Sequence, residues 1–165
     1  MSILHKVKAR KIAFLYYYQH HFVQKINRYD ISDTIVEDPI IDTDVIQSII
    51  NQQDIYPVSY IGQSQLGYMT DQYDSEFACT LIDAYDTFSN VVSDAIKPYT
   101  TTFAYEEMNA IEQSIIHLGY TEYQVLHTPY KVIIDQMVEF AKRYSSPNSA
   151  KLINWLLHTL FTTWI

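Results

Sequence analysis

The residues of this 165-residue sequence that could do chemistry are one cysteine, six histidines and a few paired acids. Cys79 lies within an apolar helical pattern, where a lone cysteine is typical of a small core residue. His20 and His21 are adjacent, so they point about 100° apart on a helix and cannot chelate one ion as an i, i+4 pair would. Glu106 and Glu107 suit a helix N-terminus, where their charges complement the helix dipole. None of these groups assembles a catalytic or metal centre.

Motifs that mark enzymes are also missing from the sequence. It has no Gly-rich phosphate loop, no zinc-protease motif and no G-x-S-x-G, and its three glycines leave few candidates for strained backbone. The remaining histidines, His5, His117, His127 and His158, show no ligand spacing. One cysteine is too few for an internal disulfide or a cysteine-based zinc cluster. We therefore expect no enzymatic activity, no metal and no cofactor, and a reducing, cytoplasmic setting.

Charge is distributed unevenly along the chain. The formal net charge is −8, which by itself argues against binding to nucleic acid. No acid precedes Asp30, and the first 29 residues carry six basic side chains: Lys6, Lys8, Arg10, Lys11, Lys25 and Arg28. The other 136 residues hold five basic and nineteen acidic residues, a net charge of −14. This asymmetry is typical of a basic helical arm on an acidic body, although basic residues also often serve only to solvate a surface helix.

The elements that must position these residues are predicted to be helices. Hydrophobic residues make up 48% of the chain, and the few glycines and prolines leave little room for the tight turns of a sandwich or barrel. Over residues 3–26, Ile12, Leu15, Phe22 and Ile26 follow one helical face, which we expect to be buried. No stretch reaches the roughly 18 to 20 apolar residues of a membrane span, and the N-terminal run does not resemble a cleavable signal, so we expect a soluble protein.

Further helices are predicted along the rest of the chain. Residues 29–43 and 56–70 are expected to be loops, and helices are expected at about 44–53, 74–96 and 105–123. Thr128-Pro129 and Ser146-Pro147 each supply an N-cap hydroxyl and a proline suited to a first helical position, so they predict the starts of the last two helices. The sequence therefore indicates one all-α domain over residues 1–165, with about six or seven helices.

Three blocks of this sequence resemble one protein family. Residues 129–136 (PYKVIIDQ), 138–144 (VEFAKRY) and 149–154 (SAKLIN) follow the pattern P-x-K-V-x-I-N-E-x-V-E-L-A-K-x-F…S-x-K-F-V-N-G-V-L. Residues 106–107 and 111–122 (IEQSIIHLGYTE) are similar to V-E-x-A-I-L-R-I-A-x-Y-E-L, and residues 8–18 (KARKIAFLYYY) to an opening R-x-A-R-x-x-A-x-x-x-L-Y. Order and approximate spacing are kept, and together the blocks resemble the NusB family of bacterial transcription antitermination factors.

The resemblance implies a fold of two packed helical subdomains and a role in antitermination complexes on ribosomal RNA operons. Members of this family bind a boxA RNA element jointly with the ribosomal protein NusE, and some of them form homodimers. By position, Lys6, Lys8 and Arg10 would contact phosphates, Tyr18 would stack on a base, and Lys151 would add a second RNA contact. Matching positions that face RNA or the partner in the family are Glu106, Glu112 and Glu122.

The chain departs from the family pattern at several positions. Trp155 replaces the glycine of the N-G pair, Leu152 replaces an aromatic residue, His117 replaces an arginine, and Asp135-Gln136 replaces the N-E pair. The basic arm also holds less arginine, and lysine lacks its bidentate geometry. A second hypothesis is therefore a diverged member that binds only proteins, and a third is an accessory domain like those preceding some RNA methyltransferases.

Overall fold

The computed structural model describes residues 2–28, 58 and 60–163, so the predicted loop at 29–43 and helix at 44–53 lie outside the described residues. The described part holds seven α-helices and no strand, which confirms the all-α prediction. The helices are α1 (Ile3–Arg28), α5 (Ser75–Asp83), α6 (Tyr85–Phe88), α7 (Val91–Ile96), α8 (Ala110–Leu126), α9 (Tyr130–Tyr144) and α10 (Pro147–Thr163). Short turns are η1 (Tyr60–Gln65), η2 (Lys97–Tyr99) and η3 (Tyr105–Glu107).

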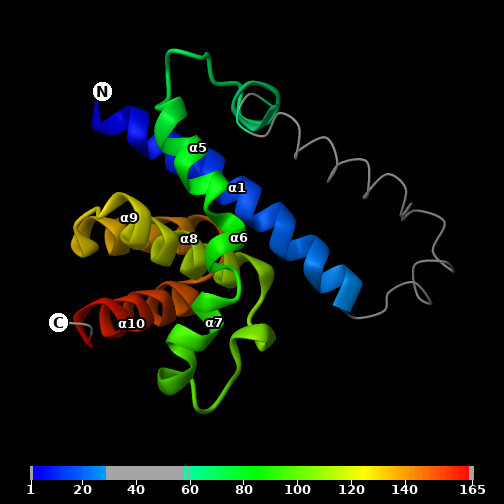
Figure 1. Cartoon of the computed structure of the whole chain (residues 1–165), viewed down its shortest axis with the longest axis vertical. Coiled ribbons are helices and arrows are strands. Elements are labelled where there is room, and N and C mark those ends of the chain that lie inside the picture. Colours follow the sequence, from blue (N-terminus) through cyan, green and yellow to red (C-terminus); the bar gives the residue numbers. More distant parts are fainter. Residues whose placement is uncertain (1, 29–57, 59, 164–165) are drawn as a thin grey trace, which may run out of the picture.

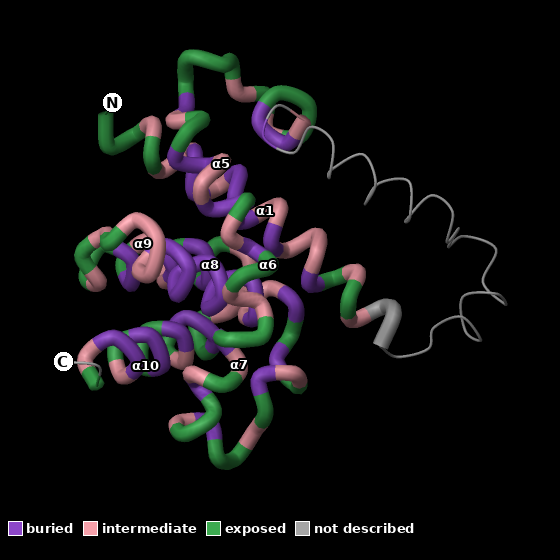
Figure 2. The backbone as a smooth tube through the Cα atoms, in the orientation of Figure 1, coloured by how far each residue is buried: buried purple, intermediate pink, exposed green. Residues whose placement is uncertain are grey.

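The helices form two groups that meet along α1 and α8. Helices α8, α9 and α10 pack on one another, while α5 and η1 pack on α1 (Figure 1). Helix α1 runs diagonally past the first group and contacts α8, and buried residues line the facing sides of both groups (Figure 2). None of the helices in the described residues is both long enough and apolar enough for a bilayer span.

The long helix predicted over residues 74–96 is broken into α5, α6 and α7, with junctions at Ala84 and at residues 89–90. The predicted start is right, because the Asp74 carboxylate caps α5 by accepting a hydrogen bond from the Phe77 backbone N–H. Helix α5 packs on α1, whereas α7 packs on α8 and α10. One straight helix could not place its apolar residues against both groups of helices. The chain therefore bends at the two junctions, which keeps these apolar residues on the side that faces the other helices.

Other predicted boundaries move by a few residues. The helix expected from 105 begins as the turn η3, and α8 proper starts after Asn109, whose side chain accepts from the Glu112 N–H at 2.8 Å. His127 ends α8 in the left-handed conformation. Ser146 accepts from the Ser149 N–H before Pro147, as predicted, whereas Pro129 itself takes the N-cap position of α9. The loop predicted at 56–70 contains the π-helical turn η1.

Gly119 allows α8 to lie close to its two neighbours. A Cβ atom at this position would lie 3.1 Å from Met137 Cγ and 3.3 Å from Ile133 Cγ2 of α9, and 3.5 Å from Leu157 Cδ1 of α10. A Cβ atom here would displace Met137 and Ile133 by a few tenths of an ångström. The glycine therefore lets α8 pack closely against α9 and α10.

The buried face of α1 differs from the predicted one. Ile12 is fully buried as expected, but Leu15 is only partly buried and Phe22 is 46% exposed, so Phe22 was wrongly assigned to the core. The helix instead buries small and polar residues with its aromatics: Ala9, Arg10, Ile12, Ala13, Phe14, Tyr17 and His21. Apolar periodicity alone missed this face because several of its members are not apolar.

A buried ion pair joins the two groups. The Arg10 guanidinium donates to both carboxylate oxygens of Glu122, with Nε 2.9 Å from Oε1 and 3.0 Å from Oε2, and Nη2 2.7 Å from Oε1. Arg10 is 4% exposed and Glu122 is fully buried. The Phe77 ring also covers the guanidinium, with its centroid 5.0 Å from Arg10 Cζ. Two desolvated charges are tolerated here because each satisfies the other in a bidentate geometry.

Two buried histidines form a second polar contact between α1 and α8. His117 Nε2 lies 3.1 Å from the Tyr85 carbonyl oxygen, which can only accept, so this nitrogen carries the proton. His117 Nδ1 must then accept from His21 Nε2–H, 2.8 Å away. Burial lowers the pKa of each imidazole to about 3, and for His21 repulsion from His117 adds to the effect. Both rings are neutral in the fold at physiological pH.

The buried ion pair should make each partner costly to remove alone. We expect Glu122→Leu to lower the free energy of unfolding by about 3 to 5 kcal/mol, because it leaves the Arg10 charge buried and unpaired. The double variant Arg10→Met/Glu122→Leu should recover most of that loss, since it removes both charges. Urea unfolding monitored by circular dichroism measures both values. A single variant as stable as the parent would contradict the buried pair.

The histidine pair should make the fold sensitive to acid. Below about pH 6.5 the imidazoles of the unfolded chain become protonated, whereas the folded rings stay neutral down to about pH 3. The free energy of unfolding therefore falls through this window by roughly 1.4 kcal/mol per pH unit for each imidazole. His117→Gln keeps a donor for Tyr85 and an acceptor for His21, and should flatten this dependence. The matched control is His158→Gln, at an exposed position of α10. Equal pH dependence in the two variants would contradict the assignment.

Candidate nucleic-acid interface

The face of α1 that points away from the core carries cationic and aromatic residues. Lys11, Tyr18 and Phe22 are seven and four residues apart, so they lie within about 40° of one another around the helix. Phe22 is 46% exposed, and Lys11 and Tyr18 are partly exposed. A flat ring beside a cation is the arrangement that binds unpaired bases and phosphates in single-stranded nucleic acid.

Aromatic rings connect this face with the C-terminal end of α9. The Phe14 ring lies 6.4 Å from that of Tyr18 and 5.3 Å from that of Tyr144, with interplanar angles of 23° and 22°. The Phe140 ring centroid lies 4.8 Å from that of Phe14, at an interplanar angle of 12°. On α1, the Phe22 ring centroid lies 6.0 Å from that of Tyr18. Phe14 and Phe140 are buried, so they form the inner support of the rings that reach the surface.

The two predicted lysines of the basic arm lie on different sides of α1. Two residues apart on a helix, Lys6 and Lys8 point about 160° away from each other. Lys6 Nζ is 5.9 Å from the Phe77 ring centroid, and Lys8 Nζ is 5.4 Å from that of Tyr68. Lys6 is exposed and Lys8 is partly exposed. They precede Tyr18 by twelve and ten residues, about 18 and 15 Å along the helix, and do not form one patch.

Two predicted site residues are corrected by the structure. Arg10 was expected to meet phosphate and Glu122 to face RNA or a partner, but both are buried against each other. Their charges are already neutralised within the fold, and neither side chain is available at the surface. No local pattern indicates this pairing, because the two residues are 112 positions apart.

The other predicted acids lie near the start of α8. Glu106 Oε1 accepts from Ser93 Oγ at 2.7 Å, and its carbonyl oxygen accepts from Lys25 Nζ at 3.2 Å. Glu112 accepts from Ser149 Oγ at 2.9 Å, which ties α8 to the start of α10. Both glutamates are partly exposed.

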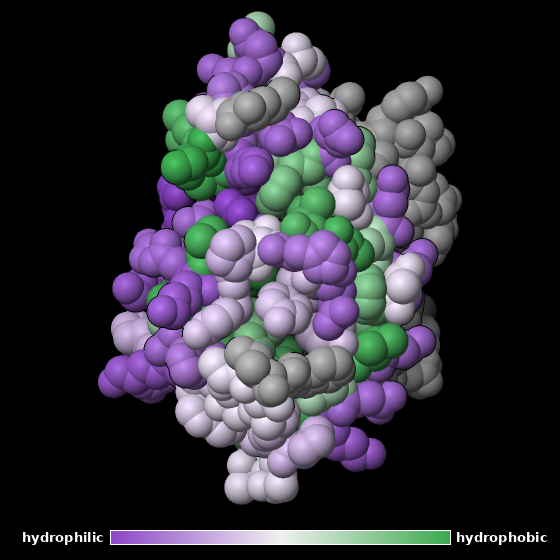
Figure 3. All heavy atoms as spheres, turned by 60° about the vertical axis from the view of Figure 1, so that its left-hand side comes forward, coloured by the Kyte–Doolittle hydropathy of each residue, from purple (hydrophilic) through white to green (hydrophobic). Residues whose placement is uncertain are grey.

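Lys151 lies near the start of α10. It is exposed at the edge of a groove between α9 and α10, with Lys142 also lining that groove. The apolar part of the groove comes from Ile134, Val138 and Ala150. On the face turned toward the viewer in Figure 3, apolar areas lie among hydrophilic residues.

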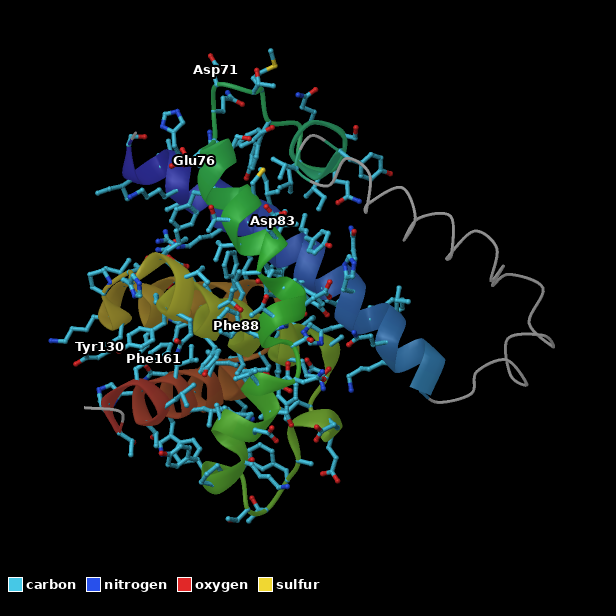
Figure 4. The ribbon with its side chains drawn as sticks, viewed as in Figure 1. Asp71, Glu76, Asp83, Phe88, Tyr130 and Phe161 are labelled. Atoms are coloured by element: carbon cyan, nitrogen blue, oxygen red, sulfur yellow. The ribbon has the colours of Figure 1, made fainter. Side chains whose placement is uncertain are left out.

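Acidic side chains lie on α5 and on the loop before it, which pack against α1. Asp71, Glu76 and Asp83 are exposed along α5 and the loop before it (Figure 4). Glu76 and Asp83 are seven residues apart and share one side of the helix. Phosphate would be repelled from this side of α5.

Phe22 and Tyr144 reach the surface although both belong to apolar stripes that predict core positions. The available signal was chemical: a phenylalanine four residues after a tyrosine on the basic helix, and a tyrosine next to Arg143 at a helix end. Within the described residues, no group of three or more histidine, cysteine or acidic side chains is placed to hold a metal ion.

Comparison with known proteins identifies the family. The model of the NusB family matches residues 7–161. The transcription antitermination protein NusB of Streptomyces griseus is 31% identical over 83 residues, which cover 50% of this chain and 58% of that protein. The NusB of Borreliella burgdorferi is 26% identical over 119 residues, covering 71% of this chain and 82% of the relative. The chain spans 58% to 62% of the length of the first curated relatives.

Solved structures share the fold. The T. maritima NusB is 22% identical, covers 93% of this chain and 88% of its own, and superposes with a TM-score of 0.61. A crystal structure of the antitermination factors NusB and NusE in complex with dsRNA is 17% identical, covers 98% and 99% of the two chains, and gives a TM-score of 0.60. With a family match over nearly its whole length and this shared helical architecture, the chain belongs to the NusB family.

Proposed function

We propose that this protein is an RNA-binding transcription antitermination factor that acts with the ribosomal protein NusE on boxA-type RNA of ribosomal RNA operons. The observation that carries the proposal is the outer face of α1, where Tyr18 is partly exposed on a helix whose described part carries no acidic residue. The family match and the complex of NusB, NusE and RNA among the structural neighbours support it. This activity would take place in the cytoplasm, with residues 1–165 acting as one domain.

Lys6, Lys8, Tyr18 and Lys151 are proposed as RNA contacts. The lysines would bind phosphates from the two sides of α1 and from the start of α10, and Tyr18 would stack on a base between them. Glu106 and Glu112 are proposed to face the protein partner. They lie on the acidic part of the chain, whose charge suits a basic partner.

A second candidate function is protein binding alone, favoured by the net charge of −8 and by the loss of arginine from the surface when Arg10 is buried. The two functions differ in their dependence on salt. Binding through phosphates weakens steeply as ionic strength rises, because each neutralised phosphate releases counterions.

Lys6→Ala/Lys8→Ala should therefore weaken binding of a fluorescein-labelled boxA-type RNA and reduce its salt dependence. The slope of log K against log salt should fall in magnitude by about 0.7 for each phosphate contact removed. Fluorescence anisotropy over a salt series, with and without NusE, measures it. The control is Lys97→Ala, which removes an exposed lysine from η2 and should leave the slope unchanged. No binding by the parent protein at low salt, with or without NusE, would leave protein binding alone as the function.

A further inference from the structure

The aromatic row between α1 and α9 continues beyond Tyr18 to a second surface ring. Tyr18 and Tyr144 flank the same buried Phe14 ring, and both lie within about 23° of its plane. Tyr144 also lies 6.4 Å from Phe140, at an interplanar angle of 29°. Helices α1 and α9 thus each place one tyrosine ring nearly parallel to the buried Phe14 ring. Packing on Phe14 holds the orientation of both tyrosine rings.

The outer members of the row differ from its core members. Phe14 and Phe140 are buried, whereas Tyr18 and Tyr144 are partly exposed and Phe22 is 46% exposed. Among the described residues, neither tyrosine hydroxyl has a hydrogen-bond partner. Packing explains the inner rings, but it does not explain an exposed phenylalanine and two tyrosines at the surface of the same row.

Two cations lie near the Phe14 and Tyr144 end of the row. The Arg143 guanidinium lies 5.8 Å from the Tyr144 ring centroid, and Lys11 lies two helical turns before Tyr18 on the same face of α1. Within the part of the chain that the structure describes, neither Lys11 nor Arg143 forms an ion pair. Both charges are therefore available to phosphates along the row.

We propose that Tyr144 and Arg143 of α9, together with Phe22 of α1, extend the Tyr18 surface into a track on which several unpaired RNA bases stack. The rings would take the bases, and Arg143 and Lys11 would take the phosphates between them. Stacking needs base faces that a duplex keeps covered, so the track selects single-stranded RNA. This inference rests on the proposed RNA-binding function and adds a second helix to its site.

The first experiment replaces the Tyr144 ring. Tyr144→Leu keeps an apolar side chain against Phe14 but removes the flat ring, and should weaken binding of a labelled single-stranded oligoadenylate about 5- to 150-fold, whereas Tyr144→Phe should keep the parent affinity. The control is Tyr130→Leu, the same change at the opposite end of α9, about 21 Å away along the helix, and it should bind as the parent does. Circular dichroism checks that each variant keeps the parent's helix content.

The second experiment reports on stacking directly. An oligoadenylate carrying 2-aminopurine should lose fluorescence on binding the parent and Tyr144→Phe, and lose less on binding Tyr144→Leu. Arg143→Gln should reduce the salt dependence of binding, and duplex RNA of the same length should show no difference between the parent and Tyr144→Leu.

The outcomes separate this inference from the function it rests on. If the parent and Tyr130→Leu bind oligoadenylate and Tyr144→Leu binds equally well with equal quenching, the track is wrong while RNA binding stands. If the parent binds no single-stranded RNA at low salt, the proposed function fails and the track fails with it. A loss specific to Tyr144→Leu supports the track.

Discussion

The ion pair between Arg10 and Glu122 fixes how α1 is rotated against the rest of the protein. A helix is rigid around its axis, so holding Arg10 inward determines the direction of every other side chain on α1. Tyr18 then lies about 80° away from Arg10 around the axis and Lys11 about 100° away, both outside the contact with α8. The surface of α1 therefore depends on a buried charge pair.

The contact between α1 and α8 includes two buried polar pairs. His21 lies on nearly the same side of α1 as Arg10, and it meets His117 where Arg10 meets Glu122. Polar groups buried in pairs are specific about their partners, since a shift by one turn would leave each of them unsatisfied. Apolar side chains would tolerate such a shift more easily. The polar pairs thus set the register of α1, while the α8–α10 group gains its cohesion from close packing at Gly119.

Sequence patterns predicted the helices well wherever local chemistry decides. Ser146 and Pro147 marked a helix start correctly. Most residues of the predicted apolar stripes are buried as their periodicity indicates: Ile133, Met137 and Phe140 of α9, and Ile153, Leu156, Leu157 and Leu160 of α10. The same patterns failed where a structural feature depends on residues that are distant in the sequence. The bends between α5 and α7 arise because two groups of helices must be contacted, and the role of Arg10 depends on a carboxylate 112 positions away. For the candidate site, the same limit hid Tyr144, which reaches α1 only through Phe14.

The uneven distribution of charge over the surface affects the rate at which a charged partner associates. Acids are exposed along α5, whereas the described part of α1 has none, so the molecule carries an electric asymmetry that is felt before contact. At physiological ionic strength such a field extends about 8 Å from the surface. If the protein binds RNA as proposed, this field turns the approaching polyanion toward α1, which raises the fraction of encounters that are productive. A protein with an overall negative charge can in this way still associate quickly with a negatively charged chain.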